Sequence, residues 1–258
     1  MFTSRKGHRN LPQPSKENLI SSGHLANLHR LTENVVRKVP CDRSYATSVR
    51  AIQTEAWIYQ HLGRHKYIAR CLEAANDHID LKFERNGDLE IYLSMHRVSC
   101  EFRCRAAVQA VKAVNYIHQE GVVHSDLSAR QFLLDEKMNV RLSDFCGSSL
   151  NGSKALVIEN PSHYLPRGQM LPSTVKSDIF ALGSTLYEIM TSQTPYHGKA
   201  DAEVQYLYKR KIYPSLDGVE NENWKRIIVG CWNGHYESAR EILEDIPSER
   251  KSWLPCCG

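Results

Sequence analysis

Apolar residues in the first third of the chain follow the spacing of strands more than that of helices. Strand-like patterns cover three stretches, of which the first reads as a hairpin: 19–31, 34–39 and 77–83. A helix-like run over 54–63 places Trp57, Ile58 and Leu62 on one apolar side and ends at Gly63. This part of the chain is therefore expected to form a sheet with one helix.

Helical spacing dominates the rest of the chain. Residues 101–119 carry a continuous apolar stripe, 173–190 form a second apolar helix, and further helices are expected from Asp201 and around 227–232. A short apolar β-hairpin over 132–142 separates the first two helices. Composition and periodicity alone thus predict an α+β chain with two lobes.

Two acids flank this short hairpin, Asp126 before it and Asp144 after it. A hairpin brings the residues at its two ends together, so both carboxylates can face one site. One carboxylate can take the proton of an incoming hydroxyl, and the other can hold a magnesium ion on a nucleotide phosphate.

The stretch 124–147 resembles the catalytic and metal-binding loops of eukaryotic protein kinases. The family's H-R-D-x-x-x-x-N and D-F-G motifs correspond here to His124, Ser125, Asp126 and Gln131, and to Asp144, Phe145 and Cys146. The resemblance implies that Asp126 accepts the proton, that Asp144 and Gln131 hold Mg²⁺, and that ATP is the phosphate donor. His124 and Phe145 are expected to be packed structural residues.

The segment before this stretch resembles the nucleotide-binding part of the family. The positions of the glycine-rich loop G-x-G-x-x-G-x-V are held by Ser21, Gly23, Ala26 and Leu28. Lys38 matches the lysine of V-A-I-K and is expected to contact the α- and β-phosphates, and Glu55 is expected to pair with it. Taken alone, the hairpin is better interpreted as an ordinary surface hairpin, and a lone lysine on a strand is usually a solvated charge at a sheet edge.

Other family segments follow in the expected order. Leu81 would lie at the back of the adenine pocket, and the backbone from Lys82 to Glu84 would contact the adenine edge. Asp178, in the predicted helix 173–190, would accept hydrogen bonds from the catalytic-loop backbone; Ser177 or Asp178 could instead cap that helix.

One position in the activation segment departs from the family. Arg167 occupies the place of the glutamate in A-P-E, and an acid, Glu237, lies near the place of that glutamate's usual arginine. This reversal suggests a charge-swapped pair between Arg167 and Glu237.

The resemblance implies a bilobal protein kinase-like fold, with a small β-rich lobe and a larger, mostly helical lobe, similar to small stand-alone fungal kinase domains. The expected boundaries are a flexible tail, the first lobe, the hinge with the second lobe, and a C-terminal tail: 1–16, 17–83, 84–245 and 246–258.

Charge and cysteine content bear on the expected partners and cellular location of the protein. The 258 residues carry a net charge of only +4, which does not favour a nucleic-acid partner. The eight cysteines lack zinc spacing and no leader is evident, so they are expected to be reduced thiols of an intracellular, cytoplasmic protein. No apolar run is long enough for a membrane span, and a monomer is expected.

The expected function is therefore an ATP- and Mg²⁺-dependent protein kinase that phosphorylates Ser/Thr, with Tyr left open because Arg130 resembles the A-A-R of tyrosine kinases. Two alternatives remain. A non-catalytic scaffold is suggested by the sparse glycine loop, Gln131 and Cys146, and a small-molecule phosphotransferase shares the two acids. Ser125 replaces the arginine that binds a phosphorylated activation loop, so activity should not depend on phosphorylation of Ser148, Ser149 or Ser153.

Overall fold

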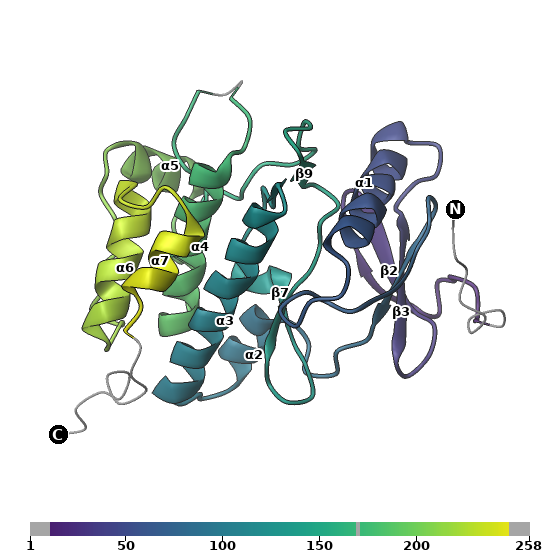
Figure 1. The fold of residues 1–258 in the computed structure, drawn as a ribbon, viewed down its shortest axis with the longest axis horizontal. Helices are drawn as coiled ribbons and strands as arrows, with labels where there is room; N and C mark the ends of the chain where they lie inside the picture. Colours follow the sequence, from purple (N-terminus) through teal and green to yellow (C-terminus); the bar gives the residue numbers. More distant parts are fainter. Residues whose placement is uncertain (1–10, 169–170, 248–258) are drawn as a thin grey trace. The chain divides into compact units, whose positions relative to one another are not determined.

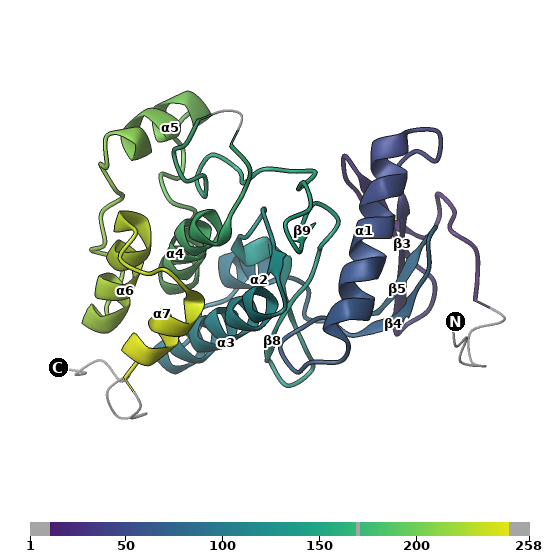
Figure 2. The same ribbon diagram turned by 45° about the horizontal axis from the view of Figure 1, so that its top comes forward.

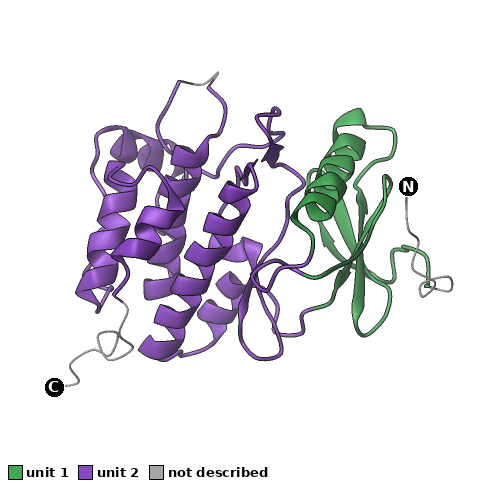
Figure 3. Cartoon of the chain, viewed as in Figure 1, with its two compact units in different colours: residues 1–63, 70–83 green, residues 64–69, 84–258 purple. Residues whose placement is uncertain are grey.

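A computed structural model describes residues 11–168 and 171–247, and the chain divides into two compact units. The first unit comprises residues 1–63 and 70–83, and the second comprises 64–69 and 84–258 (Figure 3). Most of the two predicted tails lies outside the described residues. No helix among the described residues is both long enough and apolar enough to cross a bilayer.

The first unit is an antiparallel five-stranded sheet with one helix (Figure 1). Its elements are β1 Leu19–Ser22, β2 Ala26–Arg30, β3 Val35–Pro40, α1 Ala46–Leu62, β4 Cys71–Ala74 and β5 Ile79–Lys82. The strand order is β1-β2-β3-β5-β4, so the predicted hairpin and both predicted strands are confirmed.

Helix α1 packs on the sheet, and the residues on its buried face differ from those that we predicted. It begins at Ala46 rather than near Thr54, and Gly63 ends it with an N–H bond to the carbonyl of Tyr59. Ile58 and Leu62 are buried as predicted, but Trp57 is 54% exposed. The prediction for Trp57 is wrong because the buried stripe passes through Glu55 and Ala56, which turns the next position outward.

The second unit is mostly helical, and with the sheet-rich first unit it confirms the α+β two-lobed fold class. Its helices are α2 Leu89–Met95, α3 Cys100–Gln119, α4 Val175–Thr191, α5 Asp201–Lys209, α6 Glu222–Asn233 and α7 Ala239–Asp245. Its short strands are β6 Val122–Val123, β7 Phe132–Leu134, β8 Val140–Leu142 and β9 Ser149–Leu150, and Ala129–Gln131 form one 3₁₀ turn.

Helix α4 lies at the centre of this unit, between α3 and α6 (Figures 1 and 2). Most of its residues are buried, including the polar side chains of Asp178 and Glu188 among many apolar ones. Gly183 allows the close approach of α6, because a Cβ atom there would lie 2.6 Å from Cβ of Cys231. The sequence did not predict α2 and α7, which are only seven residues long and show little periodicity.

The β7–β8 hairpin sets the geometry of the two acids. Phe132 pairs with Leu142, so the residues just outside the hairpin also lie opposite each other. The amide of Ser143 donates to the carbonyl of Gln131 at 2.9 Å, and the hydroxyl of Ser143 donates to the same oxygen at 2.9 Å. Asp144 follows directly, so the hairpin joins the end of the Asp126 loop to the start of the Asp144 loop.

Candidate active site

A buried carboxylate on α4, that of Asp178, anchors the catalytic loop. Asp178 accepts hydrogen bonds from the amides of His124 at 2.7 Å and Ser125 at 2.9 Å, and the side chain of His118 adds a third contact at 2.9 Å. The predicted contacts with the catalytic-loop backbone are therefore present. The alternative capping role holds in part for Ser177: Thr174 is the N-cap of α4, and Ser177 completes a capping box by accepting the amide of Thr174 at 2.9 Å, whereas Asp178 binds the catalytic loop.

Two residues of the loops have a left-handed backbone. The φ angle is 69° at Ser125 and 63° at Asp144, a region that non-glycine residues rarely adopt. The two amides at Asp178 hold Ser125 in this conformation. Strained backbone of this kind gathers at sites where a side chain must point in one direction, which supports a functional role for both loops.

Asp126 lies beside an amide and a cation. Its Oδ2 accepts a hydrogen bond from Nε2 of Gln131 at 2.8 Å, and the guanidinium of Arg130 approaches to 3.8 Å. Burial raises the pKa of Asp126 above its usual value, the His124 side chain opposes this, and the charge of Asp144 adds to it. The two acids therefore lie within electrostatic reach of each other.

The same hydrogen bond orients the side chain of Gln131. Because its nitrogen donates to Asp126, its carbonyl oxygen points elsewhere and can serve as a metal ligand. Together with the carboxylate of Asp144 it offers the hard oxygen donors that Mg²⁺ prefers. The donor types thus fit the ion that the resemblance implies, even though glutamine is one methylene longer than asparagine.

His124 is fully buried and holds the hairpin rather than facing solvent. Its Nε2 lies 3.0 Å from the carbonyl of Ser143, and because a carbonyl can only accept, this nitrogen carries the proton. The imidazole also contacts the ring of Phe145, with 5.4 Å between ring centroids. Both residues pack in the interior, in agreement with the structural role expected for them.

The first unit holds the predicted lysine–glutamate pair. Nζ of Lys38 on β3 lies 2.7 Å from Oε2 of Glu55 on α1. The neighbouring Arg37 points to the other face of the sheet, as alternation along a strand requires, and forms a two-fold hydrogen bond with Asp80 at 2.7 and 2.8 Å. Lys38 is therefore a paired charge and not a solvated one.

The predicted phosphate loop is the β1–β2 hairpin. Ser21 on β1 lies opposite Leu28 on β2, and the amide of Gly23 in the turn donates to the carbonyl of Ala26 at 2.9 Å. The four predicted residues are thus brought together on one hairpin.

The predicted adenine contacts are divided between the units. Leu81 is buried in β5, and the amide of Lys82 already donates to the carbonyl of Arg70 at 2.9 Å. Any contribution of Lys82 to adenine would therefore use its carbonyl oxygen. Glu84 belongs to the second unit and lies 3.9 Å from the guanidinium of Arg141.

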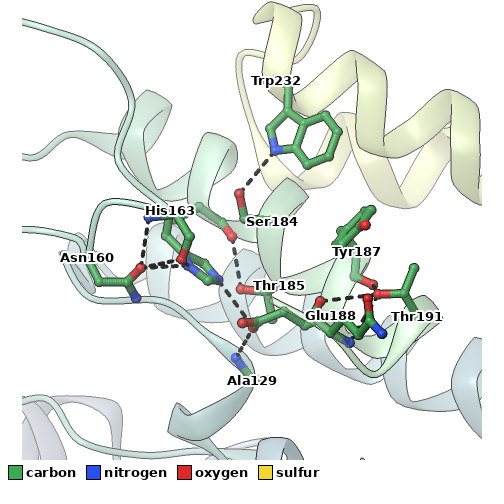
Figure 4. A network of polar contacts seen from close by, with 12 residues as sticks. Ala129, Asn160, His163, Ser184, Thr185, Tyr187, Glu188, Thr191 and Trp232 are labelled. Atoms are coloured by element: carbon green, nitrogen blue, oxygen red, sulfur yellow. Dashed lines mark hydrogen bonds and ion pairs between the residues drawn. The ribbon is translucent and has the colours of Figure 1, made fainter. Parts of the chain in front are cut away.

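Glu188 of α4 is a residue of the site that sequence reasoning missed. Its Oε2 accepts the amide of Ala129 at 2.8 Å and lies 3.2 Å from Nε2 of His163 (Figure 4). Nδ1 of His163 in turn lies 3.0 Å from Oδ1 of Asn160. The network links the catalytic stretch to the activation segment. The sequence signal for it was an acid among the apolar residues in the second half of the α4 helix.

A pocket of about 370 Å³ adjoins this network. It is lined by α2, Ala129, the end of α4 and the loop that follows, and it includes the carboxylates of Glu90 and Glu188. Burial raises the pKa of Glu90, and the charge of Glu188 raises it further. The pocket therefore has an acidic wall beside the loop that carries Asp126.

The prediction that Arg167 pairs with Glu237 is wrong. The guanidinium of Arg167 lies 2.7 Å from Glu159, and Glu237 pairs instead with Lys176 at 3.0 Å, on the surface. The acidic partner of Arg167 thus lies within the activation segment. The family pattern did not indicate a partner there.

Two of the serines named in the sequence are poor targets for modification. Ser148 is fully buried and donates its hydroxyl to the carbonyl of His124 at 2.9 Å, and Ser149 is 5% exposed. Only Ser153 of the three is exposed. That activity is independent of their phosphorylation stays a prediction.

Comparison with known proteins gives a family for the chain. A family model described as protein tyrosine and serine/threonine kinase matches residues 19–248. Serine/threonine/tyrosine-protein kinase HT1 of Arabidopsis thaliana is 26% identical over 199 residues, which cover 74% of this chain and 51% of that protein. Serine/threonine-protein kinase mos of Patiria pectinifera is 28% identical over 159 residues, which cover 55% of this chain and 45% of that protein.

A third relative is the tyrosine-protein kinase receptor TYRO3 of Danio rerio, 31% identical over 169 residues that cover 59% of this chain and 19% of that protein. The chain thus spans about half or less of the length of these relatives. Because the family model matches most of its residues, the chain belongs to the protein tyrosine and serine/threonine kinase family.

Proposed function

We propose that the chain is an active protein kinase that transfers the γ-phosphate of ATP to Ser/Thr hydroxyls of proteins. The observation that carries this proposal is the arrangement around Asp126. Its carboxylate is held by Gln131, lies within electrostatic reach of Asp144, and stands on a loop that Asp178 anchors.

In this proposal Asp126 accepts the proton of the substrate hydroxyl while the hydroxyl oxygen bonds to phosphorus and ADP leaves. Burial favours this role, because a carboxylate with a raised pKa is a stronger base near neutral pH. The hydrogen bond from Gln131 fixes the direction of the carboxylate, and orientation of this kind supplies much of the catalysis in phosphoryl transfer.

Asp144 and the carbonyl oxygen of Gln131 would hold Mg²⁺, which the family generally uses with ATP. When bound, the ion supplies positive charge that neutralises the phosphates. Lys38, kept in place by Glu55, would donate to the α- and β-phosphates. The remaining nucleotide contacts are proposed at Ser21, Gly23, Ala26, Leu28, Leu81, Lys82 and Glu84.

A protein substrate is supported by the pocket beside Ala129, which is large enough for a side chain next to the phosphorylated residue. The residue that bears on Ser/Thr against Tyr is Arg130. Arg130 lies 3.8 Å from Asp126 with 61% of its side chain exposed, as in the A-A-R pattern noted above, so tyrosine transfer belongs in the same assay.

The second candidate is a kinase-like scaffold without catalysis. Specific features favour it: the β1–β2 hairpin has Ser21 and Ala26 where the family has glycines, and Cys146 replaces the glycine after Phe145. Each change limits how closely the backbone can approach a phosphate.

The test measures ATP·Mg²⁺ binding by calorimetry and phosphate transfer to proteins, peptides and small alcohols. Asp126→Asn should bind nucleotide as the wild type does and lose at least about a hundred-fold in transfer rate. Asp217→Asn, on the exposed surface, is the matched control and should change neither. Wild-type binding without transfer would establish the scaffold, and transfer only to small alcohols would establish the small-molecule class.

A further inference from the structure

Three residues with metal-binding side chains gather on the β4–β5 hairpin of the first unit. Glu73 on β4 lies opposite Asp80 on β5, and the amide of Ala75 donates to the carbonyl of His78 at 2.9 Å to close the turn. Cross-strand partners share a face of the sheet, as do residues two apart on an extended chain. Glu73, His78 and Asp80 therefore share one face, and their ligand atoms all lie within 4.8 Å of one another.

The imidazole of His78 is held by one acid and faces another. Its Nδ1 lies 2.8 Å from Oδ1 of Asp77, and because an ionised carboxylate can only accept, Nδ1 carries the proton. In the neutral imidazole Nε2 keeps its lone pair. This nitrogen is buried and has no hydrogen-bond partner among residues 11–168 and 171–247. It lies 4.0 Å from Oε2 of Glu73, which is too far for a hydrogen bond.

A metal ion would satisfy Nε2 of His78 where a hydrogen bond does not. Zn²⁺ binds imidazole nitrogen and carboxylate oxygen at about 2.0–2.2 Å, so two ligands of a tetrahedral ion lie about 3.3 Å apart. The carboxylate of Glu73 would have to approach Nε2 by about 0.7 Å, and a side chain that is 42% exposed can make such a shift. A carboxylate that accepts from the other ring nitrogen, as Asp77 does, usually accompanies a metal-bound histidine.

Asp80 can supply a third ligand while it holds Arg37. The guanidinium donates to its two oxygens at 2.7 and 2.8 Å, and each oxygen has a second lone pair. The hydrogen bond to Asp80 raises the pKa of Arg37, although burial opposes this. The charges of Glu73 and Asp77 raise that pKa further, so all three carboxylates act on this cation. Arg43 approaches Asp77 only to 3.9 Å and is 70% exposed, so it offsets little of the negative charge. The excess of negative charge favours a divalent cation.

We propose that Glu73, His78 and Asp80 bind a divalent transition-metal ion such as Zn²⁺, with water in the fourth position. Asp77 is a positioning residue that acts through His78. The ion bridges β4 to the start of β5 and so stabilises the hairpin. The imidazole nitrogen selects for Zn²⁺ over Mg²⁺, which prefers oxygen ligands.

This metal site is separate from the contact proposed between Lys38 and the nucleotide phosphates. The site shares its face of the sheet with Arg37, and the neighbouring Lys38 points to the other face. The inference uses contacts within the first unit alone, so it does not depend on the proposed kinase function. Zn²⁺ binding can therefore be measured without nucleotide.

The test titrates Zn²⁺ into the full chain in the presence of excess Mg²⁺. Binding is followed by calorimetry and by the NMR signals of the imidazole nitrogens. The variants are His78→Ala, Glu73→Gln and Asp77→Asn, and the matched control is His235→Ala, at an exposed histidine of the second unit. Thermal unfolding of each variant without Zn²⁺ shows whether it is folded.

In the wild type, Zn²⁺ should shift the Nε2 signal of His78 while Nδ1 stays protonated. Asp77→Asn should weaken binding at this site about 10–100-fold, the range usual when the partner of a metal-bound histidine is lost. His78→Ala should weaken it by more than about 100-fold and Glu73→Gln by at least about ten-fold, because each removes a ligand. His235→Ala should bind as the wild type does.

Unchanged His78 signals in excess Zn²⁺ would overturn the proposal, and this measurement on the wild type is decisive even if a variant does not fold. Equal losses in His78→Ala and His235→Ala would also overturn it, because they indicate adventitious binding by surface histidines. Displacement of Zn²⁺ by an equal concentration of Mg²⁺ would indicate a carboxylate cluster that does not use the imidazole, and would overturn it as well.

Discussion

Asp178 offers a sharp test of how the catalytic loop is held, through the substitution of asparagine. The change is nearly isosteric but replaces one carboxylate oxygen by an NH₂ group. In the structure the two oxygens serve three donors: Oδ2 accepts from His124 and His118, and Oδ1 accepts from Ser125. The most favourable orientation of the asparagine side chain keeps its oxygen facing His124 and His118. Its NH₂ group then faces the backbone N–H of Ser125, and two donors cannot bond to each other.

The magnitude follows from these contacts. A buried N–H without a partner costs about 1–3 kcal/mol, which applies to the amide of Ser125. The two remaining bonds lose the charge of the acceptor, which weakens each by roughly 1 kcal/mol. Asp178→Asn should therefore lower the free energy of unfolding by about 3–5 kcal/mol, or Tm by roughly 10 °C for a chain of this size.

The assay is thermal unfolding together with transfer kinetics at a temperature where the variant is folded. Because Ser125 directly precedes Asp126, a loop shift of about 1 Å should lower kcat by about a hundred-fold. Asp217→Asn, whose carboxylate accepts only a surface bond from Ser215, should stay within about 0.5 kcal/mol of wild type. A Tm within about 2 °C of wild type for Asp178→Asn would refute the reasoning.

Three further predictions concern other parts of the second unit. Gly183→Ala should lower the free energy of unfolding, measured by chemical denaturation, by about 1–3 kcal/mol, because the new Cβ would meet Cβ of Cys231 at 2.6 Å. An unchanged denaturation midpoint would contradict the close packing of α4 and α6. Burial alone would raise the pKa of Asp135, but hydrogen bonds from Asn139 and Arg141 outweigh it and hold that pKa below its usual 3.8. The stabilisation from Asp135 is present at neutral pH and is lost as pH falls below about 3.8. Asp135→Asn should therefore make the free energy of unfolding less dependent on pH in the acid range. A variant whose free energy of unfolding falls with pH as steeply as that of wild type would argue against this. Phosphatase treatment and Ser153→Ala should leave transfer rates within about two-fold, and a large loss in either would show dependence on a phosphorylated segment.

Much of the fold could be predicted because its elements carry strong periodicity. The stripe of α3 and the many apolar residues of α4 allow few alternatives, and the β7–β8 hairpin is marked by the apolar triplet 132–134 and by Val140 and Leu142 on the other side of a polar turn. The spacing of Asp126, Asp144 and Asp178 identified the loop and its anchor. Local pattern and motif order agree at these positions, so the sequence alone was sufficient.

The wrong predictions, for Trp57 and for the partner of Arg167, have a different cause. Trp57 was placed inside because a large apolar residue next to Ile58 suggested it, but the buried face of α1 passes through Glu55, whose partner is on a separate strand. Glu237 was expected to pair with Arg167 because it lies near the place of the family's arginine, but the acid that packs against Arg167 is Glu159, eight residues earlier. Contacts between side chains distant in sequence depend on packing, which periodicity does not record.

Three departures from the family pattern in the second unit, at Ser125, Gln131 and Arg167, are matched by contacts of their own, whereas Cys146 remains a feature that favours the scaffold. Where Gln131 replaces asparagine it bonds to Asp126, and where Arg167 replaces glutamate it gains a buried acid as partner. Ser125, in place of arginine, is tied to Asp178 through its backbone, which any residue could supply. Each of these three replacements is integrated into contacts that support the loops. A failure of catalysis would therefore be expected to arise in the β1–β2 hairpin, where two glycines are missing. The turn is held by the bonds from Gly23 to Ala26, from Ser22 to Asn27 and from Cys41 to the carbonyls of His24 and Leu25, and none of these restores the close backbone approach that glycine allows.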